Sequence, residues 1–429
     1  QQCVALQREA RKMREANNVL KGLLANPLST REQDAVRELG FEHLSREELI
    51  AKGRGFKEEL AKIEEREQPL LKEIESMAAQ MPNFSSPTSP EGQEAKVLEL
   101  IGGEHPEKGD TTDRVWKSHV HIGSECEILD FASAAQSSGW GWYYLLNEGA
   151  MLEQALVQYA ISKALARGWK FVSPPSIVYS HAASACGFLP RDTNGETQVY
   201  TLNQSEEDKA RGVPEMSLAG TAEIPLAAMG ANRVFAPSEL PKRHVAVSRC
   251  YRAEAGARGV DTKGLYRVHE FTKVELFAFT SPDLEETTKT FESIVSMQKE
   301  VLSELGLHAR VLEMPTTDLG ASAYRKIDIE AFFPSRRDRD EGYGEVTSTS
   351  ICTDYQARRL NSVVKSKDGR NFVYTVNGTG MAVPRVLACI LENGWDEDRR
   401  VVKIPECLWP WMGGVKEIKT KVSAVVDYV

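Results

Sequence analysis

The sequence predicts an α+β fold, in which antiparallel strands combine with helices. One observation is a long β-hairpin at Val245–Phe279, where two runs of β-branched and aromatic residues flank a turn-prone segment, 255–264. A second is a pair of helices with heptad spacing inside residues 1–81. A third is a helix at 149–168 that leads into a proline-interrupted strand, 169–177. The 429 residues leave room for a sheet domain and a helical appendage.

The helical appendage is predicted from apolar residues that fall alternately three and four positions apart. In the first helix these are Cys3, Leu6, Ala10, Met13, Asn17, Leu20 and Leu24, with Asn17 as one polar member. In the second they are Phe56, Leu60, Ile63, Leu70, Ile74, Met77 and Met81, with Glu67 as an interruption. Pro69 is expected to kink or split this helix, because proline lacks an N–H and clashes with the preceding turn. The pairs Asn26-Pro27 and Met81-Pro82 end the helices, which together predict an antiparallel hairpin.

The first helix carries an excess of positive charge. Its basic residues are Arg8, Arg11, Lys12, Arg14 and Lys21, against the two acidic residues Glu9 and Glu15. Such a run is usually a solvated helix face, but as a group these side chains are also suited to the phosphates of an RNA backbone. The connection, residues 26–54, is longer and more irregular than a simple turn.

The composition is that of an ordinary globular protein, with 41% hydrophobic and 27% charged residues. The net charge of -9 excludes a chain that is basic all over, so any nucleic-acid surface is expected to be local. No apolar run approaches the roughly 20 residues that span a bilayer, so no membrane partner is expected. Seven scattered cysteines without a CxxC pair indicate a reducing compartment.

Residues 82–118 are rich in Ser, Pro, Gly and charge, and we expect them to form a linker that contains one short strand, VLELI. His119 and His121 come next with a spacing compatible with a metal. Because no further ligand cluster lies nearby in the sequence, a structural role is the better interpretation.

The next stretch predicts a buried helix and then a strand. The apolar positions of 149–168 have helical spacing, at Leu152, Ala155, Leu156, Tyr159, Ala160 and Ala164. Gly168 suits the C-terminal cap of this helix. Pro174 and Pro175 interrupt the subsequent strand, which is typical of an edge or an interface.

The Val245–Phe279 hairpin carries unusual side chains for a pair of buried strands. Because side chains alternate along a strand, Arg252 and Glu254 share one face of the first strand. The same rule groups residues of the second strand on one face: Arg267, His269, Phe271, Lys273 and Glu275. The common interpretation is a solvated face, and the alternative is the floor of a site for a charged, planar ligand such as a nucleotide.

The hairpin sequence YRAEAGA followed by RVHEFTKVELF resembles motif 2 of class II aminoacyl-tRNA synthetases, in the form found in seryl-tRNA synthetases. Four further segments resemble the family in the same order: the helix and strand at 149–177 (motif 1), GTAE at 220–223, EVTS at 345–348 and NGTGMAVPR at 377–385 (motif 3). The resemblance covers roughly residues 1–414. It implies an antiparallel class II sheet flanked by helices, with an N-terminal antiparallel coiled-coil arm, in a homodimer.

The resemblance also implies domain bounds: a tRNA-binding arm at 1–81, a linker at 82–118 and a catalytic domain at 119–429. In the arm, the residues expected to contact tRNA(Ser) are Arg8, Arg11, Lys12 and Arg14. The motif 3 segment is expected to be a strand, 372–376, a glycine-rich turn and a helix from Ala382 to Glu392. Pro384 departs from the small residue usual in the family, but proline fits the first turn of a helix.

For L-serine, the resemblance implies a site made of Thr221, Glu223, Arg252, Glu275, Asn377 and Thr379. In the sequence Thr-x-Glu, a hydroxyl and a carboxylate are expected on the same side of an extended segment. Carboxylates suit the ammonium group of a free amino acid. Glu275 is the expected acceptor for the serine hydroxyl, and such a hydrogen bond discriminates more strongly than size does.

For ATP, the implied residues are Arg252, Glu254, Arg267, His269, Phe271, Glu345, Val346, Thr347, Ser348 and Arg385. Arg252 suits the α-phosphate together with the serine carboxylate, and Phe271 suits stacking on adenine. Glu345 and Ser348 are the implied ligands of a Mg²⁺ ion on ATP, since magnesium prefers oxygen ligands. We expect Arg252, Arg385 and Glu345 to act directly in catalysis.

The expected reaction is ATP-dependent ligation of serine to tRNA(Ser) through seryl-adenylate, with release of pyrophosphate and AMP. Two alternatives remain: a paralogue that loads activated serine onto a carrier protein, and a non-catalytic RNA-binding relative. The helical arm argues against the first, and Arg252, Glu275 and Arg385 argue against the second. Pro384 and the irregular arm favour the mitochondrial matrix as the location, with the cytoplasm as the alternative.

Overall fold

A computed structural model of the chain describes residues 2–25, 36–107, 116–189, 197–253, 264–367 and 369–421, apart from the side chains of residues 25 and 79. By its internal contacts the chain divides into two compact units, Gln1–Met81 and Pro82–Val429. In the described part of the chain no helix is both long and apolar enough to cross a membrane.

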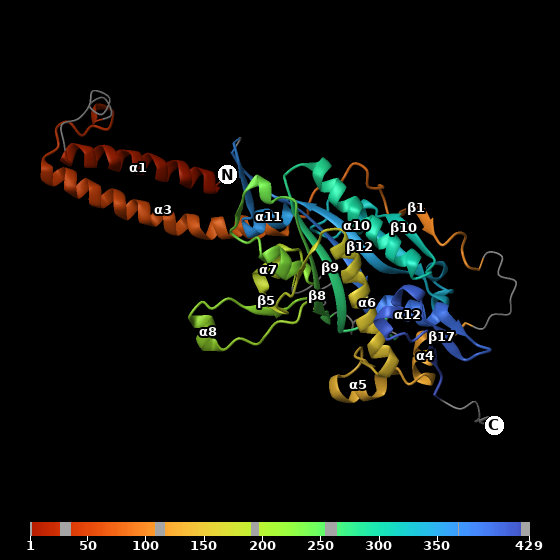
Figure 1. The fold of residues 1–429 in the computed structure, drawn as a ribbon. Coiled ribbons are helices and arrows are strands. Elements are labelled where there is room, and N and C mark those ends of the chain that lie inside the picture. Colours follow the sequence, from red (N-terminus) through yellow and green to blue (C-terminus); the bar gives the residue numbers. More distant parts are fainter. Residues whose placement is uncertain are drawn as a thin grey trace. The chain divides into compact units, whose positions relative to one another are not determined.

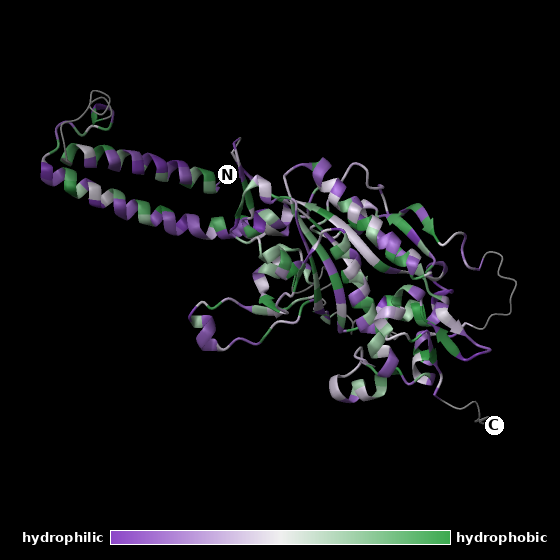
Figure 2. Ribbon diagram, in the orientation of Figure 1, coloured by the Kyte–Doolittle hydropathy of each residue, from purple (hydrophilic) through white to green (hydrophobic). Residues whose placement is uncertain are grey.

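The first unit is a pair of long helices, α1 (Gln2–Ala25) and α3 (Arg46–Gln80). They are antiparallel: Leu6 and Ala10 pack with Ile63, and Leu20 packs with Leu49 near the other end (Figure 1). Figure 2 shows that most other residues of the pair are hydrophilic, as expected of two helices that bury only one stripe each. The predicted helical hairpin is therefore confirmed, and both helices end where the sequence indicated.

The second helix differs from its prediction in three respects. It begins ten residues earlier, at a capping box in which the Ser45 hydroxyl accepts from the Glu48 N–H and the Glu48 carboxylate accepts from the Ser45 N–H. Of the two effects predicted for Pro69, a kink or a split, the split does not occur: the helix runs through Pro69 to Gln80. The predicted seam stops at Leu70. The next three members, Ile74, Met77 and Met81, are exposed because α3 is longer than α1.

The second unit is built on an eight-stranded sheet in the order β1-β10-β11-β12-β15-β9-β8-β4. All neighbours are antiparallel except β4 and β8. The strands are β1 (Lys96–Ile101), β10 (Ala309–Glu313), β11 (Arg325–Phe332), β12 (Tyr343–Thr353), β15 (Tyr374–Ala382), β9 (Glu270–Thr280), β8 (Lys242–Tyr251) and β4 (Lys170–Val172). The hairpin predicted at Val245–Phe279 is the β8–β9 pair. The strand predicted at 169–177 is shorter: it ends at Val172 as the edge strand β4, and Pro174 and Pro175 lie between it and β5 (Ile177–Tyr179), which belongs to another sheet.

The two faces of the sheet carry different cores. Val274, Leu276 and Ala278 of β9 join the larger core, to which α6 (Asn147–Ala166), α10 (Leu284–Glu304) and α12 (Val383–Gly394) contribute. Figure 1 shows α6 and α10 lying across this side of the sheet. Phe277 and Phe279 point the other way, into a smaller core with α7 (Ser180–Ala185), α9 (Glu223–Ala228) and α11 (Tyr355–Leu360). Further along the same face of β9, Phe271, Lys273 and Glu275 line a pocket instead of this core.

Smaller elements complete the unit. They are α4 (His119–Glu125), β2 (Leu129–Asp130), α5 (Phe131–Ser138), β3 (Tyr144–Leu145), β5 (Ile177–Tyr179), α8 (Glu206–Ala210), β6 (Met216–Leu218), β7 (Val234–Phe235), β13 (Val363–Ser366), β14 (Gly369–Phe372), β16 (Trp395–Asp396), β17 (Val401–Lys403) and β18 (Glu417–Lys419). Short 3₁₀ turns lie at Pro237–Glu239 (η1), Thr316–Asp318 (η3), Pro334–Arg336 (η4), Asp340–Gly342 (η5) and Glu406–Met412 (η6).

Residues 82–107, inside the expected linker, lie in the second unit. The Asn83 N–H donates to the Ala321 carbonyl, the Ser86 N–H donates to the Tyr324 carbonyl, and β1 pairs with β10. The predicted strand VLELI is therefore present as an edge strand of the main sheet.

The motif 3 segment forms differently from its prediction. The sequence NGTG was expected to be a turn, but it lies inside β15. Its glycines serve close packing: a Cβ on Gly378 would lie 2.6 Å from Ile294 Cγ2 of α10, and one on Gly380 would lie 2.9 Å from Leu276 Cδ1 of β9. The helix after the strand is α12, as predicted, with Pro384 in its first turn.

Candidate active site

A pocket of about 200 Å³ lies over the end of the sheet face that the short helices leave uncovered. It is lined by Phe188, Thr221, Glu223, Arg252, Tyr266, Arg267, Val268, Phe271, Lys273, Glu275, Glu345, Val346, Thr347, Ser348, Asn377, Thr379, Ala382, Pro384 and Arg385. The structure thus brings together almost all the site residues that the sequence predicts, from five distant stretches of chain.

Two predicted residues are exceptions. Glu254 lies outside the described residues. His269 does not line the pocket, contrary to its expected place in the ATP site and unlike Arg267, which also precedes β9, because its ring is held by Tyr200 and Trp142. Its ring stacks on Trp142 at 5.7 Å, and its backbone carbonyl accepts a hydrogen bond from the Arg252 N–H. His269 therefore holds the Arg252 backbone in place without lining the pocket itself.

Strand alternation sets the floor of the pocket. Phe271, Lys273 and Glu275 of β9 point to the same face, since successive side chains of a strand alternate. The Arg252 guanidinium carbon lies 5.3 Å from the centroid of the Phe271 ring. Lys273 Nζ and Glu275 Oε2 are 2.6 Å apart and almost fully buried, and Thr379 of β15 is the register partner of Glu275. A planar aromatic group therefore lies beside a compact polar one.

At the polar end, Glu223 is held by a buried relay. Gln356 Nε2 donates to Glu223 Oε1 at 2.6 Å, and Gln356 Oε1 accepts from the Thr375 hydroxyl at 2.7 Å. Burial, reinforced by the nearby Glu275 carboxylate, raises the pKa of Glu223 to about 7. A cationic ligand at this end would favour the charged carboxylate.

The Thr-x-Glu segment reaches the pocket by a different route from the one predicted. The backbone is not extended, because Ala222 has helical dihedral angles (φ -65°, ψ -16°) and Glu223 begins α9. Thr221 and Glu223 nevertheless both line the pocket, and the Glu223 N–H donates to the Thr221 hydroxyl at 3.3 Å.

The other end of the pocket is organised by Arg385, in the first turn of α12. Its Nη1 lies 3.2 Å from Glu345 Oε2, its Nε donates to the Tyr266 carbonyl at 3.0 Å, and its guanidinium lies over the Tyr266 ring. Burial alone would raise the pKa of Glu345, but Arg385, Lys326 and Arg252 together hold it well below its usual range. The Glu345 carboxylate is therefore ionised at neutral pH.

The donor set at this end fits a magnesium ion that is shared with phosphates. Glu345 supplies a charged carboxylate and Ser348 a hydroxyl, both on β12. In the described part of the chain no group of three or more His, Cys, Asp or Glu residues could hold a metal by itself. This combination is typical of magnesium, which often takes one or two protein ligands and completes its shell with substrate phosphates and water.

Sequence reasoning missed several residues of the site. Lys273 and Tyr266 both lie in the Val245–Phe279 hairpin, and Lys273 was predicted on the polar face of its strand, but neither was assigned to a ligand. No pattern in the sequence connects Gln356 with Glu223, which it reaches from α11. Asp328 does not line the pocket, but it is the register partner of Ser348 on β11. Asp328 is buried and paired with Lys326 at 2.7 Å, and its burial raises its pKa.

The arm residues expected to bind tRNA are all exposed on α1. Arg8, Arg11, Lys12 and Arg14 project from the surface of the first unit. Two of them have acidic neighbours, Arg11 with Glu15 at 3.0 Å and Arg14 with Glu64 at 2.9 Å. Exposed ion pairs are weak, so these arginines can exchange partners with a phosphate at little cost.

The antiparallel sheet and the pocket on its face identify the class of protein, and comparison with known proteins gives the same class. Residues 200–394 match the family described as the tRNA synthetase class II core domain (G, H, P, S and T). The chain is 31% identical to the crystal structure of a seryl-tRNA synthetase from Pyrococcus horikoshii complexed with ATP, with a TM-score of 0.80 over 97% of this chain and 92% of that one. The chain is therefore a class II aminoacyl-tRNA synthetase by fold and core domain.

The family within this class is indicated by closer relatives. The chain is 44% identical over 375 residues to the mitochondrial serine–tRNA ligase of Saccharomyces cerevisiae, covering 86% of this chain and 80% of that protein. It is 40% identical to a serine–tRNA ligase of Rhodopirellula baltica, covering 86% and 83%. The chain belongs to the family of serine–tRNA ligases.

Proposed function

We propose that the pocket activates L-serine with ATP and that the enzyme then transfers the seryl group to tRNA(Ser). Membership of the serine–tRNA ligase family supports this overall activity. The observation that carries the site is the pocket itself, in which carboxylates for an ammonium group and arginines for phosphates lie on one sheet face. The role of each residue rests on this arrangement.

Serine would lie at the polar end of the pocket. Glu223 and Thr221 would receive its ammonium group, and Glu275, held by Lys273, would accept a hydrogen bond from its hydroxyl. Asn377 and Thr379 of β15 would close the site from the side. A pocket that pairs a hydroxyl in this way rejects analogues that lack it, because its own polar groups would be left unpaired.

ATP would lie along the rest of the floor. Phe271 offers a ring face to adenine, with Arg252 and Arg267 beside it. Arg252 would bridge the serine carboxylate and the α-phosphate, while Arg385 and the backbone at Val346 and Thr347 would face the phosphate chain. When bound by Glu345 and Ser348, Mg²⁺ would neutralise phosphate charge and hold the pyrophosphate group in place.

The chemistry of both steps depends on this placement. A serine carboxylate oxygen attacks the α-phosphorus, the new O–P bond replaces the bond to the β-phosphate oxygen, and pyrophosphate leaves with the electron pair. Arg252 and Arg385 stabilise the charge on the transferring group, so positioning and electrostatics supply most of the catalysis. The 3′-terminal ribose hydroxyl of tRNA then attacks the carbonyl carbon. The bond from that carbon to the phosphate oxygen breaks, AMP leaves with the electron pair, and the hydroxyl proton passes to solvent.

Recognition of tRNA(Ser) would fall to the arm, residues 1–81. The catalytic domain would take residues 119–429, and of the expected linker, 82–118, the part 82–107 packs on that domain through β1. Arg8, Arg11, Lys12 and Arg14 would contact phosphates along one face of α1, so binding would weaken as salt rises. The matching proteins of S. cerevisiae and Schizosaccharomyces pombe are named as mitochondrial. This favours the mitochondrial matrix, although a similarly close relative is bacterial.

A homodimer would form through the segment that resembles motif 1. Its edge strand and the next strand expose apolar side chains, with Phe171 50%, Ile177 43% and Tyr179 49% accessible. Phe171 lies on β4, at the edge of the main sheet, and Ile177 and Tyr179 lie on β5, which pairs with β6. Exposed apolar side chains of this size are typical of a protein interface. Sedimentation should give twice the mass of the chain, and a monomer at micromolar concentration would contradict this.

Two assays on the purified enzyme test the proposal. Serine-dependent ATP–pyrophosphate exchange without tRNA tests the activation step, and its absence would favour a non-catalytic RNA-binding relative. Charging of purified tRNA(Ser) with labelled serine tests the transfer. Exchange without charging would favour a paralogue that loads a carrier protein.

A further inference from the structure

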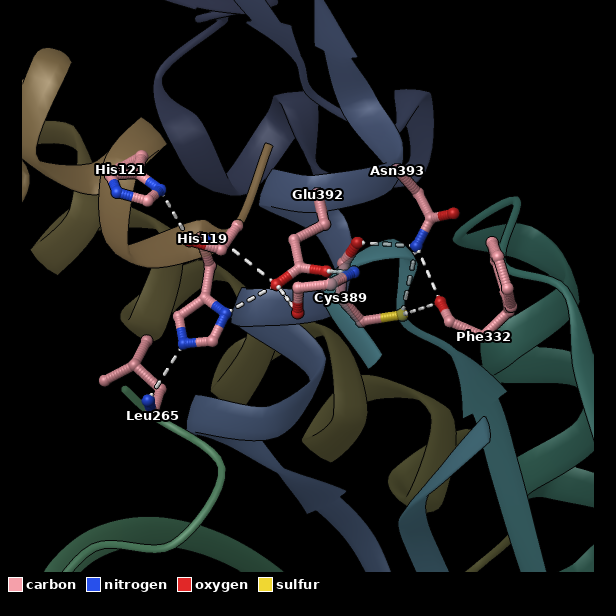
Figure 3. A network of polar contacts seen from close by, with 9 residues as sticks. His119, His121, Leu265, Phe332, Cys389, Glu392 and Asn393 are labelled. Carbon is pink, nitrogen blue, oxygen red and sulfur yellow. Dashed lines mark hydrogen bonds and ion pairs between the residues drawn. The ribbon is translucent and has the colours of Figure 1, made fainter. Parts of the chain in front are cut away.

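A buried histidine–glutamate pair joins four segments of the chain (Figure 3). His119 Nδ1 of α4 is 2.6 Å from Glu392 Oε1 of α12, and both side chains are almost inaccessible to solvent. The Glu392 carboxylate also accepts from the His119 N–H at 3.1 Å and from the Ser335 N–H and hydroxyl at 2.9 and 2.7 Å. On the opposite side of the ring, His119 Nε2 accepts from the Leu265 N–H at 3.0 Å.

The two hydrogen bonds of the ring fix its tautomer. A backbone N–H can donate only to an imidazole nitrogen that carries no proton, so Nε2 is the acceptor. Nδ1 therefore carries the proton and donates a hydrogen bond to the Glu392 carboxylate. The carboxylate thus orients the histidine, and the histidine in turn holds Leu265. Figure 3 shows this chain of contacts running from α12 through the ring to the Leu265 backbone.

Leu265 matters because its neighbour in the chain contacts the pocket arginine. Tyr266 is the next residue, and its carbonyl accepts the hydrogen bond from Arg385 Nε, while its ring lies under the Arg385 guanidinium with 4.5 Å to the ring centroid. The preceding residue, Gly264, has φ +69°, and a Cβ there would lie 2.1 Å from His119 Nε2. The backbone at 264–266 is therefore pressed against the histidine on one side and against Arg385 on the other.

We propose that His119 is a positioning residue for adenylate formation: with Glu392 behind it, it holds the Leu265 N–H so that Tyr266 keeps the Arg385 guanidinium aimed at the phosphates. The inference rests on the proposed role of Arg385 in the activation step. His119 does not line the pocket, and its effect passes through Leu265 and Tyr266. Glu392 and Arg385 also lie on the same helix, α12, so this helix contacts the 264–266 backbone directly through Arg385 and indirectly through His119.

Two substitutions separate the two hydrogen bonds of the ring. In His119→Asn the amide nitrogen stands where Nδ1 was, so the bond to Glu392 is kept and the acceptor for Leu265 is lost. In His119→Gln the amide oxygen reaches the place of Nε2, so the acceptor for Leu265 is kept. His121→Ala is the matched control, because His121 lies two residues away on the same helix, is exposed, and bonds only to Ser118 within the described structure.

We expect His119→Asn to lower kcat for serine-dependent pyrophosphate exchange by about fivefold to tenfold, the size of one lost buried hydrogen bond, with the KM for serine unchanged. His119→Gln should recover most of this loss, and His121→Ala should match the wild type. Amide hydrogen exchange reports the same contact without activity: the Leu265 amide should exchange faster in His119→Asn than in His119→Gln.

Two results would overturn the inference. One is equal loss of kcat in His119→Asn and His119→Gln in step with their melting temperatures, which would make the pair a core stabiliser only. The other is unchanged protection of the Leu265 amide in His119→Asn. Failure of the proposed function looks different, because the wild type itself would then show no serine-dependent exchange.

Discussion

The ionisation of Glu223 predicts a specific dependence of serine binding on pH. Its pKa is raised from 4.5 to about 7, first by burial and then by the Glu275 carboxylate. Lys273, Arg252 and the Gln356 hydrogen bond act in the opposite direction but do not cancel the shift. At a pKa of about 7 the carboxylate is roughly nine-tenths ionised at pH 8 and roughly one-tenth ionised at pH 6. Because the serine ammonium group needs the charged form, the KM for serine should rise about tenfold from pH 8 to pH 6.

The same shift has the opposite sign for the stability of the unliganded protein. In the unfolded chain Glu223 loses its proton near 4.5, whereas in the folded protein it keeps the proton up to about 7. Stability is therefore lost as the pH rises between these values, by about 3 kcal/mol in total. Glu223→Gln should raise the free energy of unfolding at pH 8 by up to about 3 kcal/mol and leave it nearly unchanged at pH 4.

The assay is serine-dependent pyrophosphate exchange measured from pH 6 to pH 8, with the KM for ATP as an internal reference. Glu223→Gln should bind serine weakly at every pH, and the exposed Glu207→Gln serves as the matched control. The reasoning is refuted if the KM for serine varies less than twofold over this range, or if Glu223→Gln keeps the pH dependence of the wild type.

Three further predictions concern the other parts of the enzyme. Phe271→Ala should raise the KM for ATP by about 10- to 100-fold through lost stacking while the KM for serine stays constant, and equal changes in both would contradict the adenine assignment. Arg385→Lys should lower kcat for exchange by about 100- to 1000-fold, since one preorganised donor to the developing charge is lost; a change of less than fivefold would exclude this role. Ile63→Ala should lower the free energy of unfolding of the arm by about 2–4 kcal/mol and reduce tRNA charging, with pyrophosphate exchange intact. Loss of exchange in this variant would contradict the separation of the two tasks.

The residues on the floor of the pocket were predictable because strand alternation is a local rule. Phe271, Lys273 and Glu275 share a face of β9 whatever its register with neighbouring strands. Charged side chains on that face argued against a hydrophobic core there, because unpaired buried charge is costly. His269 shows the limit of the same rule, because it lies before the strand begins and its ring contacts Tyr200 and Trp142 instead of the pocket. The NGTG segment shows another limit: glycines predict a turn, but here they admit the side chains of α10 and β9.

Contacts between distant segments could not be predicted from the sequence. Nothing near Glu223 indicates that Gln356 would reach it, because the two residues meet only once α9 and α11 pack on the same face. Similarly, the seam of α3 continues in the sequence through Ile74 and Met77, although α1 is too short to cover them. A periodic pattern reveals which face is apolar, but the partner determines how much of that face is buried.

The central claim is that one sheet face holds serine and ATP side by side, with Glu275 reading the serine hydroxyl. The most direct measurement is pyrophosphate exchange with serine and with alanine, in the wild type and in Glu275→Gln. The wild type should prefer serine by a factor of up to about 10⁴, and Glu275→Gln should lose most of that preference. Comparable exchange with alanine in the wild type, or full preference for serine in Glu275→Gln, would contradict the claim.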